Sequence, residues 1–184
     1  MEGEAWDGGD LNGRVLLVHA EQGLGDSFQF ARYLPLLADK GGTVIFSAQD
    51  PIASLMAQMP TMPDTIGATE PLPEYDVHAP LMSLPFLLGG GPPMIPDDGP
   101  WLSADHSRIA QWRNAMTGPE FKIGIAWQGN PNYKSDRHRS IPLTEFTPVA
   151  AIPGIRLYSL QQGFGAEQID AVSWESAIMR FGPD

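Results

Sequence analysis

The 184-residue sequence contains no cysteine, and this absence excludes disulfides, thiolate metal sites and cysteine nucleophiles together. No apolar run is long enough to span a bilayer, because the longest, residues 81–88, is interrupted by Ser83 and Pro85. The acidic, glycine-rich first 13 residues have neither the basic flank nor the apolar core of a signal peptide. We therefore expect a soluble, cytoplasmic protein.

Basic residues are also scarce. Eleven Lys and Arg stand against 22 Asp and Glu, which gives a formal net charge of −11. A surface this acidic repels phosphate backbones, so the composition argues against a nucleic-acid-binding protein. Hydrophobic residues make up 42% of the chain, which is enough for a packed core, and the 20 Gly and 18 Pro indicate many turns.

The few cations are unevenly distributed along the chain. No Lys or Arg lies between Lys40 and Arg108, whereas four lie within residues 122–139, where Asp136 is the single acid. A cationic patch in an anionic chain is typical of an anion-binding site. The alternative is a solvated loop whose charges pair with nearby acids.

Apolar runs alternate with turn signals along the first 118 residues. The apolar runs predict strands at residues 14–20, 43–48, 65–68 and 75–79. Helices are expected at residues 27–39, 51–59 and 107–116, and a Gly/Pro-rich loop at 89–100. Pro35 predicts a kink or an early end of the first helix. The alternation predicts an α/β fold, with a Rossmann-like parallel sheet flanked by helices.

A boundary is expected near Gly118, because the pattern restarts there. Residues 121–127 and 155–160 predict two more buried strands, and residues 144–151 predict a short helix. We therefore expect one domain over residues 1–118 and the beginning of a second α/β lobe over residues 119–184. Such an incomplete lobe would leave both strands with unpaired edges, which predicts self-association. Residues 163–184 show no period that predicts an element.

The first candidate site is the loop between His19 and Asp26, at the carboxyl end of the first strand. Gly23 and Gly25 resemble half of a dinucleotide fingerprint, but Phe28 holds the third glycine position. Asp26 at the expected helix start would occupy the N–H groups that a pyrophosphate needs. Its carboxylate could orient or deprotonate an attacking hydroxyl, or it could be an ordinary N-cap. His19 is the weaker candidate, because a histidine that ends a buried strand usually belongs to the core.

The second candidate site is the loop over residues 128–140, which contains most of the cationic patch. It offers amide groups, a glycine that allows close approach to the backbone, and cations that bind phosphate oxygens. These residues are Gln128, Gly129, Asn130, Lys134, Arg137 and Arg139. The sequence has neither a Walker loop nor His and carboxylates at metal-ligand spacing, so we expect no metal and no cofactor.

Four segments resemble one known family. Residues 19–37 (HAEQGLGDSFQFARYLPLL) closely resemble the opening of the glycosyltransferase-like domain that follows tetratricopeptide repeats in many bacterial proteins. That domain is akin to the ADP-heptose:lipopolysaccharide heptosyltransferases. Residues 125–131 (IAWQGNP) and 136–143 (DRHRSIPL) resemble its interdomain motif, and residues 158–161 (YSLQ) fit its next strand. The resemblance covers residues 6 to about 182.

The resemblance implies the two-lobed glycosyltransferase-B architecture, with an acceptor lobe first and a nucleotide-sugar lobe second. By position, Asp26 corresponds to the proposed general base, and the acceptor-side loop comprises His19, Gln22, Gly23 and Gly25. The loop over residues 128–139 corresponds to the place where the donor diphosphate is held without a metal. The implied reaction transfers a sugar from a nucleotide-diphospho-sugar, a co-substrate, to an acceptor hydroxyl on a glycan, lipid or protein.

The family's donor lobe continues with an Asp-Thr-Ala-type helix start that has no counterpart before Asp184. We therefore expect the chain to be part of a longer enzyme and inactive by itself. Two alternatives stay open: a binding module that keeps the anion site without transfer, and a structural fragment without a ligand. Saturable binding of a nucleoside diphosphate would exclude the second alternative.

Overall fold

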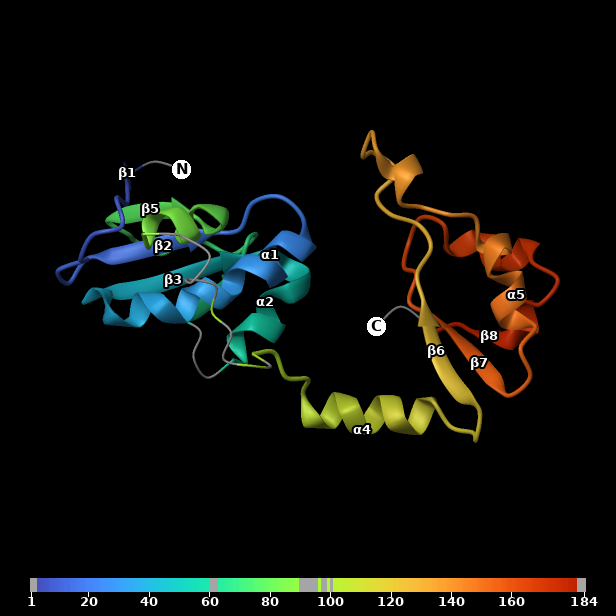
Figure 1. Ribbon diagram of the computed structural model, residues 1–184. Helices are drawn as coiled ribbons and strands as arrows, with labels where there is room; N and C mark the ends of the chain where they lie inside the picture. Colours follow the sequence, from blue (N-terminus) through green and yellow to red (C-terminus); the bar gives the residue numbers. More distant parts are fainter. Residues whose placement is uncertain (1–2, 60–62, 90–95, 97–98, 100, 182–184) are drawn as a thin grey trace. The chain divides into compact units, whose positions relative to one another are not determined.

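The protein is represented by a computed structural model that describes residues 3–59, 63–89, 96, 99 and 101–181. The chain divides into two compact units, Met1–Ala110 and Gln111–Asp184, each with its own parallel sheet (Figure 1). The division lies inside helix α4 (His106–Ala115), before Gly118, where the sequence predicts the boundary. An α/β fold with parallel sheets flanked by helices is confirmed.

The first unit contains a five-stranded parallel sheet in the order β1-β5-β2-β3-β4. Its strands are β1 (Glu4–Ala5), β2 (Val15–His19), β3 (Thr43–Ala48), β4 (Asp64–Gly67) and β5 (Val77–Pro80). Its helices before α4 are α1 (Leu24–Phe30), the 3₁₀ helix η1 (Ala31–Lys40), α2 (Asp50–Ala57), the 3₁₀ helix η2 (Leu81–Ser83) and α3 (Leu84–Leu87).

The strand order of this sheet reverses at β2. The chain runs outward from β2 through β3 to β4, and then returns to β5 on the other side of β2. In open parallel sheets, ligands bind beside the carboxyl ends of the strands at such a reversal. The loop that follows β2 therefore lies at the position where this class of sheet holds ligands.

The main core cluster of the first unit takes alternate residues of β2, and Leu17 between them is also fully buried. Leu16 and Val18 of β2 are fully buried in one cluster with Phe46 of β3. Leu34 and Leu37 of η1 are buried in the same cluster. Burial of each such side chain contributes about 1.5–3 kcal/mol. The packing of β2 against β3 and η1 therefore holds β2, and the loop that follows it, in place.

The expected helix over residues 27–39 is two helices, and it begins three residues earlier than predicted. The α-helix ends at Phe30, and a 3₁₀ helix continues from Ala31 with Pro35 inside it. Proline has no N–H to donate to the carbonyl four residues earlier, which here belongs to Ala31. The early end predicted from Pro35 is therefore a change from α-helix to 3₁₀ helix between Phe30 and Ala31.

The second unit contains a three-stranded parallel sheet in the order β6-β7-β8. Its strands are β6 (Phe121–Ile125), β7 (Ile155–Ser159) and β8 (Ile178–Met179). Its helices after α4 are η4 (Asp136–His138), η5 (Leu143–Phe146), α5 (Thr147–Ala150), η6 (Ala166–Ala171) and η7 (Glu175–Ala177), of which α5 is α-helical and the others are 3₁₀. The helix expected over residues 144–151 is thus a 3₁₀ turn followed by one α-turn. A separate core cluster includes Trp127, Leu143 and Leu157.

The strand predictions for this unit require two corrections. β6 is not buried on both faces: Ile125 is its one buried residue, and Phe121 is 72% exposed. The reason is that β6 lies at the edge of the sheet and pairs with β7 alone. β7, in contrast, is paired on both sides, because β8 pairs with Leu157 and Tyr158 on its other side.

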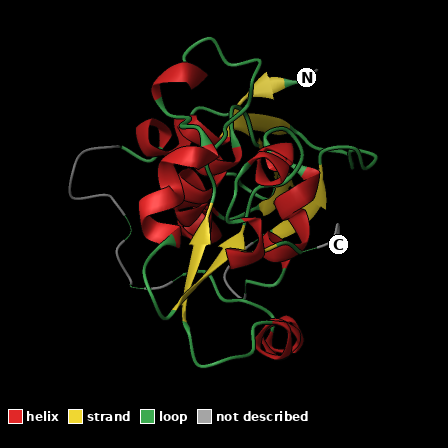
Figure 2. Ribbon diagram, turned by 90° about the vertical axis from the view of Figure 1, so that its right-hand side faces the viewer, coloured by secondary structure: helices red, strands yellow, loops and turns green. Residues whose placement is uncertain are grey.

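The second half of helix α4 belongs to the second unit and makes an aromatic contact within it. Trp112 in its second half meets the ring of Phe181 edge-on, at 4.5 Å between ring centroids, and Phe181 stacks on Tyr158 of β7. No residue of α4 is buried (Figure 2 views this helix along its axis). Across the described part of the chain, no helix has the length and apolar character needed to cross a membrane. Most of the loop expected at residues 89–100 lies outside the described residues.

Candidate functional site

The loop after β2 turns sharply into α1. Gln22 has a φ of 65°, in the left-handed region that residues other than glycine rarely adopt. Gly23 is the N-cap of α1, and Asp26 is the third residue of that helix. The Asp26 carboxylate accepts a hydrogen bond at 2.9 Å from the backbone N–H of Gly23. Asp26 is therefore not the N-cap; it closes the first turn from inside the helix, as the glutamate of a capping box does.

The same loop is tied to the end of β3. Ser27 is fully buried, and its hydroxyl donates a hydrogen bond to Gln49 Oε1 at 2.8 Å. The Gln49 amide in turn donates to the carbonyl of Gln22 at 3.5 Å. Neither Ser27 nor Gln49 was predicted as a site residue, because the sequence gives no sign that residues 22 positions apart meet. Together they hold the turn that presents Gly23 and Gly25.

Two ionisable side chains flank this turn. The ring of His19, at the end of β2, lies 5.8 Å from the ring of His78 on β5. Burial, followed by the neighbouring His78, lowers the pKa of His19. Burial also raises the pKa of Glu21, although the backbone N–H groups of Met82 and Leu81 favour its ionised form. Glu21 Oε2 is buried and has no hydrogen-bond partner among the described residues.

The second candidate loop is organised around Asp136, which is only 6% exposed. Its Oδ2 accepts hydrogen bonds from Gln128 Nε2 and Ser140 Oγ, both at 2.7 Å. Its Oδ1 accepts from Arg139 Nε at 3.1 Å. The hydrogen bond from Ser140 and the pairing with Arg139 lower the pKa of Asp136 against the effect of burial. In the sequence, Asp136 was recognisable only as the single acid among these cations.

Gly129 lies against this cluster and has no room for a side chain. A Cβ at Gly129 would lie 2.2 Å from Asp136 Oδ1 and 2.9 Å from Arg139 Nε. The backbone N–H of Gly129 donates to Ser140 Oγ at 2.8 Å. The sequence predicted that Gly129 lets a ligand approach the backbone. In the structure, side chains of the same loop lie against Gly129.

Gln161, at the end of β7, holds the start of the loop. Its Oε1 accepts hydrogen bonds from the backbone N–H groups of Trp127 and Gln128, at 3.2 and 3.0 Å. Its amide donates to the Gln128 carbonyl at 3.0 Å. Trp127 is buried, and its indole N–H donates to the Gly165 carbonyl at 2.9 Å, so Trp127 packs inside the unit and cannot stack on a ligand.

The loop cations differ in what they contact. Arg139 pairs with Asp136, and its guanidinium lies 4.8 Å from the ring centre of Tyr133. Lys134 and Arg137 line a hollow of about 600 Å³, and no described carboxylate lies within ion-pair distance of either. The hollow is also lined by Tyr133 and Phe164, which are both more than half exposed. It therefore joins positive charge to aromatic surface.

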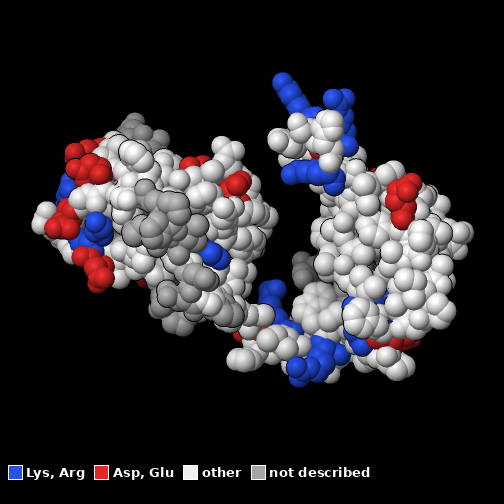
Figure 3. Space-filling model, in the orientation of Figure 1, with Lys and Arg blue, Asp and Glu red and all other residues white. Residues whose placement is uncertain are grey.

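The difference in net charge between the two units favours anion binding at this loop. Residues 1–110 contain 15 Asp and Glu against 4 Lys and Arg, whereas residues 111–184 contain seven of each. All of the net negative charge therefore belongs to the first unit. Figure 3 shows Lys and Arg gathered on the projecting loop that follows β6. An anion would meet the least repulsion there.

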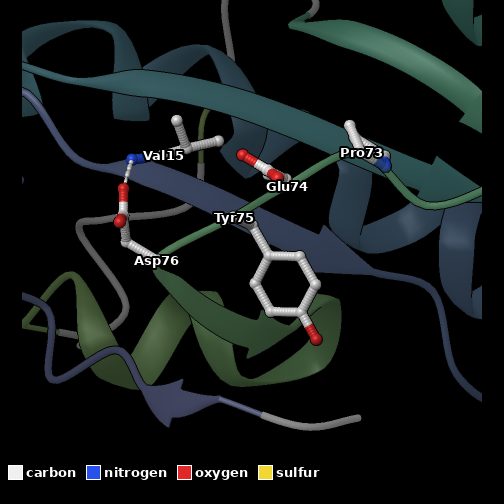
Figure 4. A pocket seen from close by; sticks show the side chains of 5 residues that line it. All are labelled: Val15, Pro73, Glu74, Tyr75 and Asp76. Atoms are coloured by element: carbon white, nitrogen blue, oxygen red, sulfur yellow. Dashed lines mark hydrogen bonds between the residues drawn. The ribbon is translucent and has the colours of Figure 1, made fainter.

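Other hollows have less to offer an anion. The hollow in Figure 4, about 550 Å³, is lined by Val15 and residues 73–76, and the Asp76 carboxylate accepts the Val15 N–H at 2.7 Å. It lies at the amino end of β2, opposite the edge where parallel sheets hold ligands. A third hollow is lined by the acids Asp50 and Glu70. Over the described ranges, no three His, Asp or Glu side chains gather as a metal site would require.

The structure brings the predicted residues together as two groups. The β2–α1 junction of the first unit contains five of them: His19 ends β2, Gln22 and Gly23 lie in the loop, and Gly25 and Asp26 lie in the first turn of α1. Gln128, Gly129, Asn130, Lys134, Arg137 and Arg139 share the loop after β6 in the second unit. Asn130 turns the loop locally: its Oδ1 accepts the Asn132 N–H, and its carbonyl accepts the Tyr133 N–H. Each group is a separate candidate site on its own unit.

Comparison with known proteins finds similarity to Protein FlbA of Caulobacter vibrioides (strain ATCC 19089 / CIP 103742 / CB 15), with 26% identity over 205 aligned residues. The alignment includes all of this chain and 34% of that protein, so the chain spans about a third of the relative's length. No protein-family model matches the sequence. No solved structure matches it either.

Proposed function

We propose that the chain is a glycosyltransferase-like domain of the glycosyltransferase-B type. In a longer protein it would transfer a sugar from a nucleotide-diphospho-sugar to an acceptor hydroxyl, without a metal and in the cytoplasm. The observation that carries the proposal is the cationic loop after β6, where Lys134 and Arg137 line a partly aromatic hollow and form no ion pair with a described carboxylate. The parallel sheets and the resemblance of residues 19–37 and 125–143 agree with this activity.

The chemistry of the transfer explains why such a loop is useful. When the bond between the sugar and the diphosphate breaks, the departing nucleoside diphosphate gains negative charge. Cations fixed beside the departing oxygens stabilise that charge, and this is the usual role of a bound metal. Lys134 and Arg137 are suited to the role because neither is neutralised by a described carboxylate.

Asp26 is the proposed general base for the acceptor. One carboxylate oxygen is held by the Gly23 N–H, which fixes the orientation of the group, and the side chain remains partly exposed. The other oxygen accepts no hydrogen bond from the described residues, so it is free to accept the proton of an acceptor hydroxyl. The acceptor would be a glycan, a lipid or a protein.

A second candidate is a module that binds nucleoside diphosphate without transfer. The hydrogen bond from the Gly23 N–H to Asp26 favours this candidate, because capping the helix would account for Asp26 without any catalytic role. The two candidates share the anion site and differ only in the fate of the sugar.

Binding is tested by isothermal titration calorimetry of the chain with UDP and ADP, with inorganic phosphate for comparison. We expect saturable binding of a diphosphate, weakened by about 1.5–3 kcal/mol in Arg137→Ala, the scale of a charge-assisted hydrogen bond. Arg180→Ala is the matched control, because Arg180 is an exposed arginine paired with Asp170 outside the loop. A wild-type chain that binds neither diphosphate would contradict the proposal.

Transfer is tested in a longer protein that contains this chain, using a labelled nucleotide-sugar. We expect transfer that is lost in Asp26→Asn, because the amide cannot accept the acceptor's proton. Diphosphate binding without transfer in the wild-type protein would establish the binding module instead.

A further inference from the structure

The cations of the loop after β6 are not equivalent. Arg139 has a carboxylate and an aromatic partner, although 55% of its side chain is exposed: its Nε donates to Asp136, its guanidinium lies 4.8 Å from the centre of the Tyr133 ring, and Gly129 lies beside it. Lys134 and Arg137 line the hollow, as Asp136 does, but no described carboxylate lies within ion-pair distance of either cation. Among the described residues, Arg137 Nε donates only to the neighbouring His138 Nε2, at 3.2 Å. The difference originates at Asp136, the single acid in this stretch.

Asp136 also connects the two ends of the loop. Its carboxylate joins Gln128, the first loop residue, to Ser140, the last, through hydrogen bonds of 2.7 Å each. The Asp136 carbonyl accepts the backbone N–H groups of Arg139 and Ser140 at 2.9 Å. One nearly buried side chain thus closes the loop and fixes the direction in which the residues between its ends project.

We propose that Asp136 is a positioning residue that commits Arg139 to the loop and leaves Lys134 and Arg137 as the cations that meet an anionic ligand. The identity of that ligand as a nucleoside diphosphate rests on the proposed function. The division of roles among the cations does not, because it follows from contacts within the loop. The charge of Arg139 stabilises the loop, and the charges of Lys134 and Arg137 bind the ligand.

The division of roles is tested without any ligand by labelling with phenylglyoxal, a reagent that attacks accessible, unpaired arginines. A chymotryptic digest keeps Arg137 and Arg139 on one peptide, and tandem mass spectrometry of that peptide locates the label on each arginine separately. We expect Arg137 to react faster than Arg139 by about threefold or more, because Arg139 is paired and stacked. Equal rates in the wild-type chain would overturn the proposal, whether or not any variant folds.

Two variants identify Asp136 as the cause. Asp136→Asn keeps the shape of the side chain but removes its charge, and we expect the rate of Arg139 to rise by about threefold while that of Arg137 stays unchanged. Ser140→Ala is the matched control, because it removes one hydrogen bond to the same carboxylate and leaves the ion pair. A general loosening of the loop would raise both arginine rates in both variants. A folded Asp136→Asn chain in which Arg139 stays protected would overturn the proposal.

The binding role is tested by calorimetry with UDP. We expect Lys134→Met and Arg137→Met each to weaken binding by about tenfold, and Arg139→Gln by less than about threefold. An Arg139 effect equal to that of Arg137 would overturn the division of roles. A wild-type chain that does not bind UDP would instead reject the proposed function, and the labelling pattern would still decide the role of Asp136.

Discussion

Among single residues, the two candidate loops use their carboxylates in opposite ways. Asp26 is partly exposed and engages one backbone N–H, that of Gly23. Asp136 is nearly buried and engages three side chains. An exposed carboxylate with a free oxygen can meet a substrate, whereas a buried one with all partners filled acts through its neighbours. The chemistry of the first loop and the geometry of the second therefore depend on different kinds of acid.

The capping role of Asp26 predicts a difference between two substitutions. Asp26→Ala removes the acceptor of the Gly23 N–H and should destabilise the chain by about 1 kcal/mol, whereas Asp26→Asn keeps an acceptor oxygen and should cost less than about 0.5 kcal/mol. Urea unfolding followed by circular dichroism measures both free energies. Equal stability of Asp26→Ala and the wild type would show that the 2.9 Å contact contributes nothing.

The environment of His19 predicts how stability depends on pH. Burial and His78 lower its pKa in the folded chain, so the unfolded chain takes up the proton first. Stability is therefore lost as the pH falls through about 6.5, the unfolded value, toward the lower folded value. Urea unfolding between about pH 7.5 and pH 5.5 should show this loss in the wild type and a flatter profile in His19→Gln. His106→Gln, an exposed histidine on α4, is the control and should keep the wild-type profile.

At the scale of elements, the sequence predicted strands best where apolar runs are continuous. β2, β3 and β7 lie within one residue of the expected ends, because each is a short apolar run bounded by turn residues. β8 and the 3₁₀ helices η6 and η7 could not be predicted, because two-residue strands and single turns have no periodicity. The exposure of β6 depends on its place at the edge of a sheet, which its own residues do not encode.

The two candidate loops were predictable to different extents. The cationic loop around Lys134 was predictable, because the positions of charged residues can be read directly from the sequence. The side chains that hold the loop were not predictable: Gln161 binds it from a position 33 residues further along the chain. The start of α1 was misplaced because Gly23, a weaker N-cap signal than Ser or Asp, begins the helix.

The glycines of the two loops predict opposite responses to alanine. A Cβ at Gly129 would lie 2.2 Å from Asp136 Oδ1, so Gly129→Ala should destabilise the second unit by about 1–3 kcal/mol. Gly25 is inside α1 with nothing within 4 Å of its Cβ position, so Gly25→Ala should stabilise the first unit by about 0.5 kcal/mol. Urea unfolding of the two variants measures both effects. An unchanged free energy of unfolding in Gly129→Ala would mean that the Asp136 carboxylate moves aside at no energetic cost.

Over the whole molecule, the two units differ in sheet size and in charge. The first has five strands and all of the net negative charge, and the second has three strands and no net charge. A three-stranded sheet buries less surface on folding, and its edge strand β6 carries the exposed Phe121. Lys122 in the same strand opposes pairing with another chain, because a charged side chain disfavours edge-to-edge contact.

This inequality predicts that the second unit opens more readily than the first. Hydrogen exchange of the purified chain, read by mass spectrometry, should show slower exchange in β2 than in β7, although both are paired on two sides. Light scattering on the same sample should show a mass that rises with concentration if β6 mediates self-association, and a lower mass for Phe121→Ser. Equal protection of β7 and β2 in a monomer would show that the second unit is a complete domain.

The pairing of β1 with β5 has a consequence for how the chain is made. Glu4 aligns with Val77, so β1, which is synthesised before the other strands of its sheet, has no partner until a strand 73 residues later has been synthesised. At about 5–20 residues per second, that wait is roughly 4–15 s. β2, β3 and β4 can assemble during this interval, because each pairs with a strand that is adjacent in order of synthesis. β1, though translated before the other strands of its sheet, is therefore added to that sheet last.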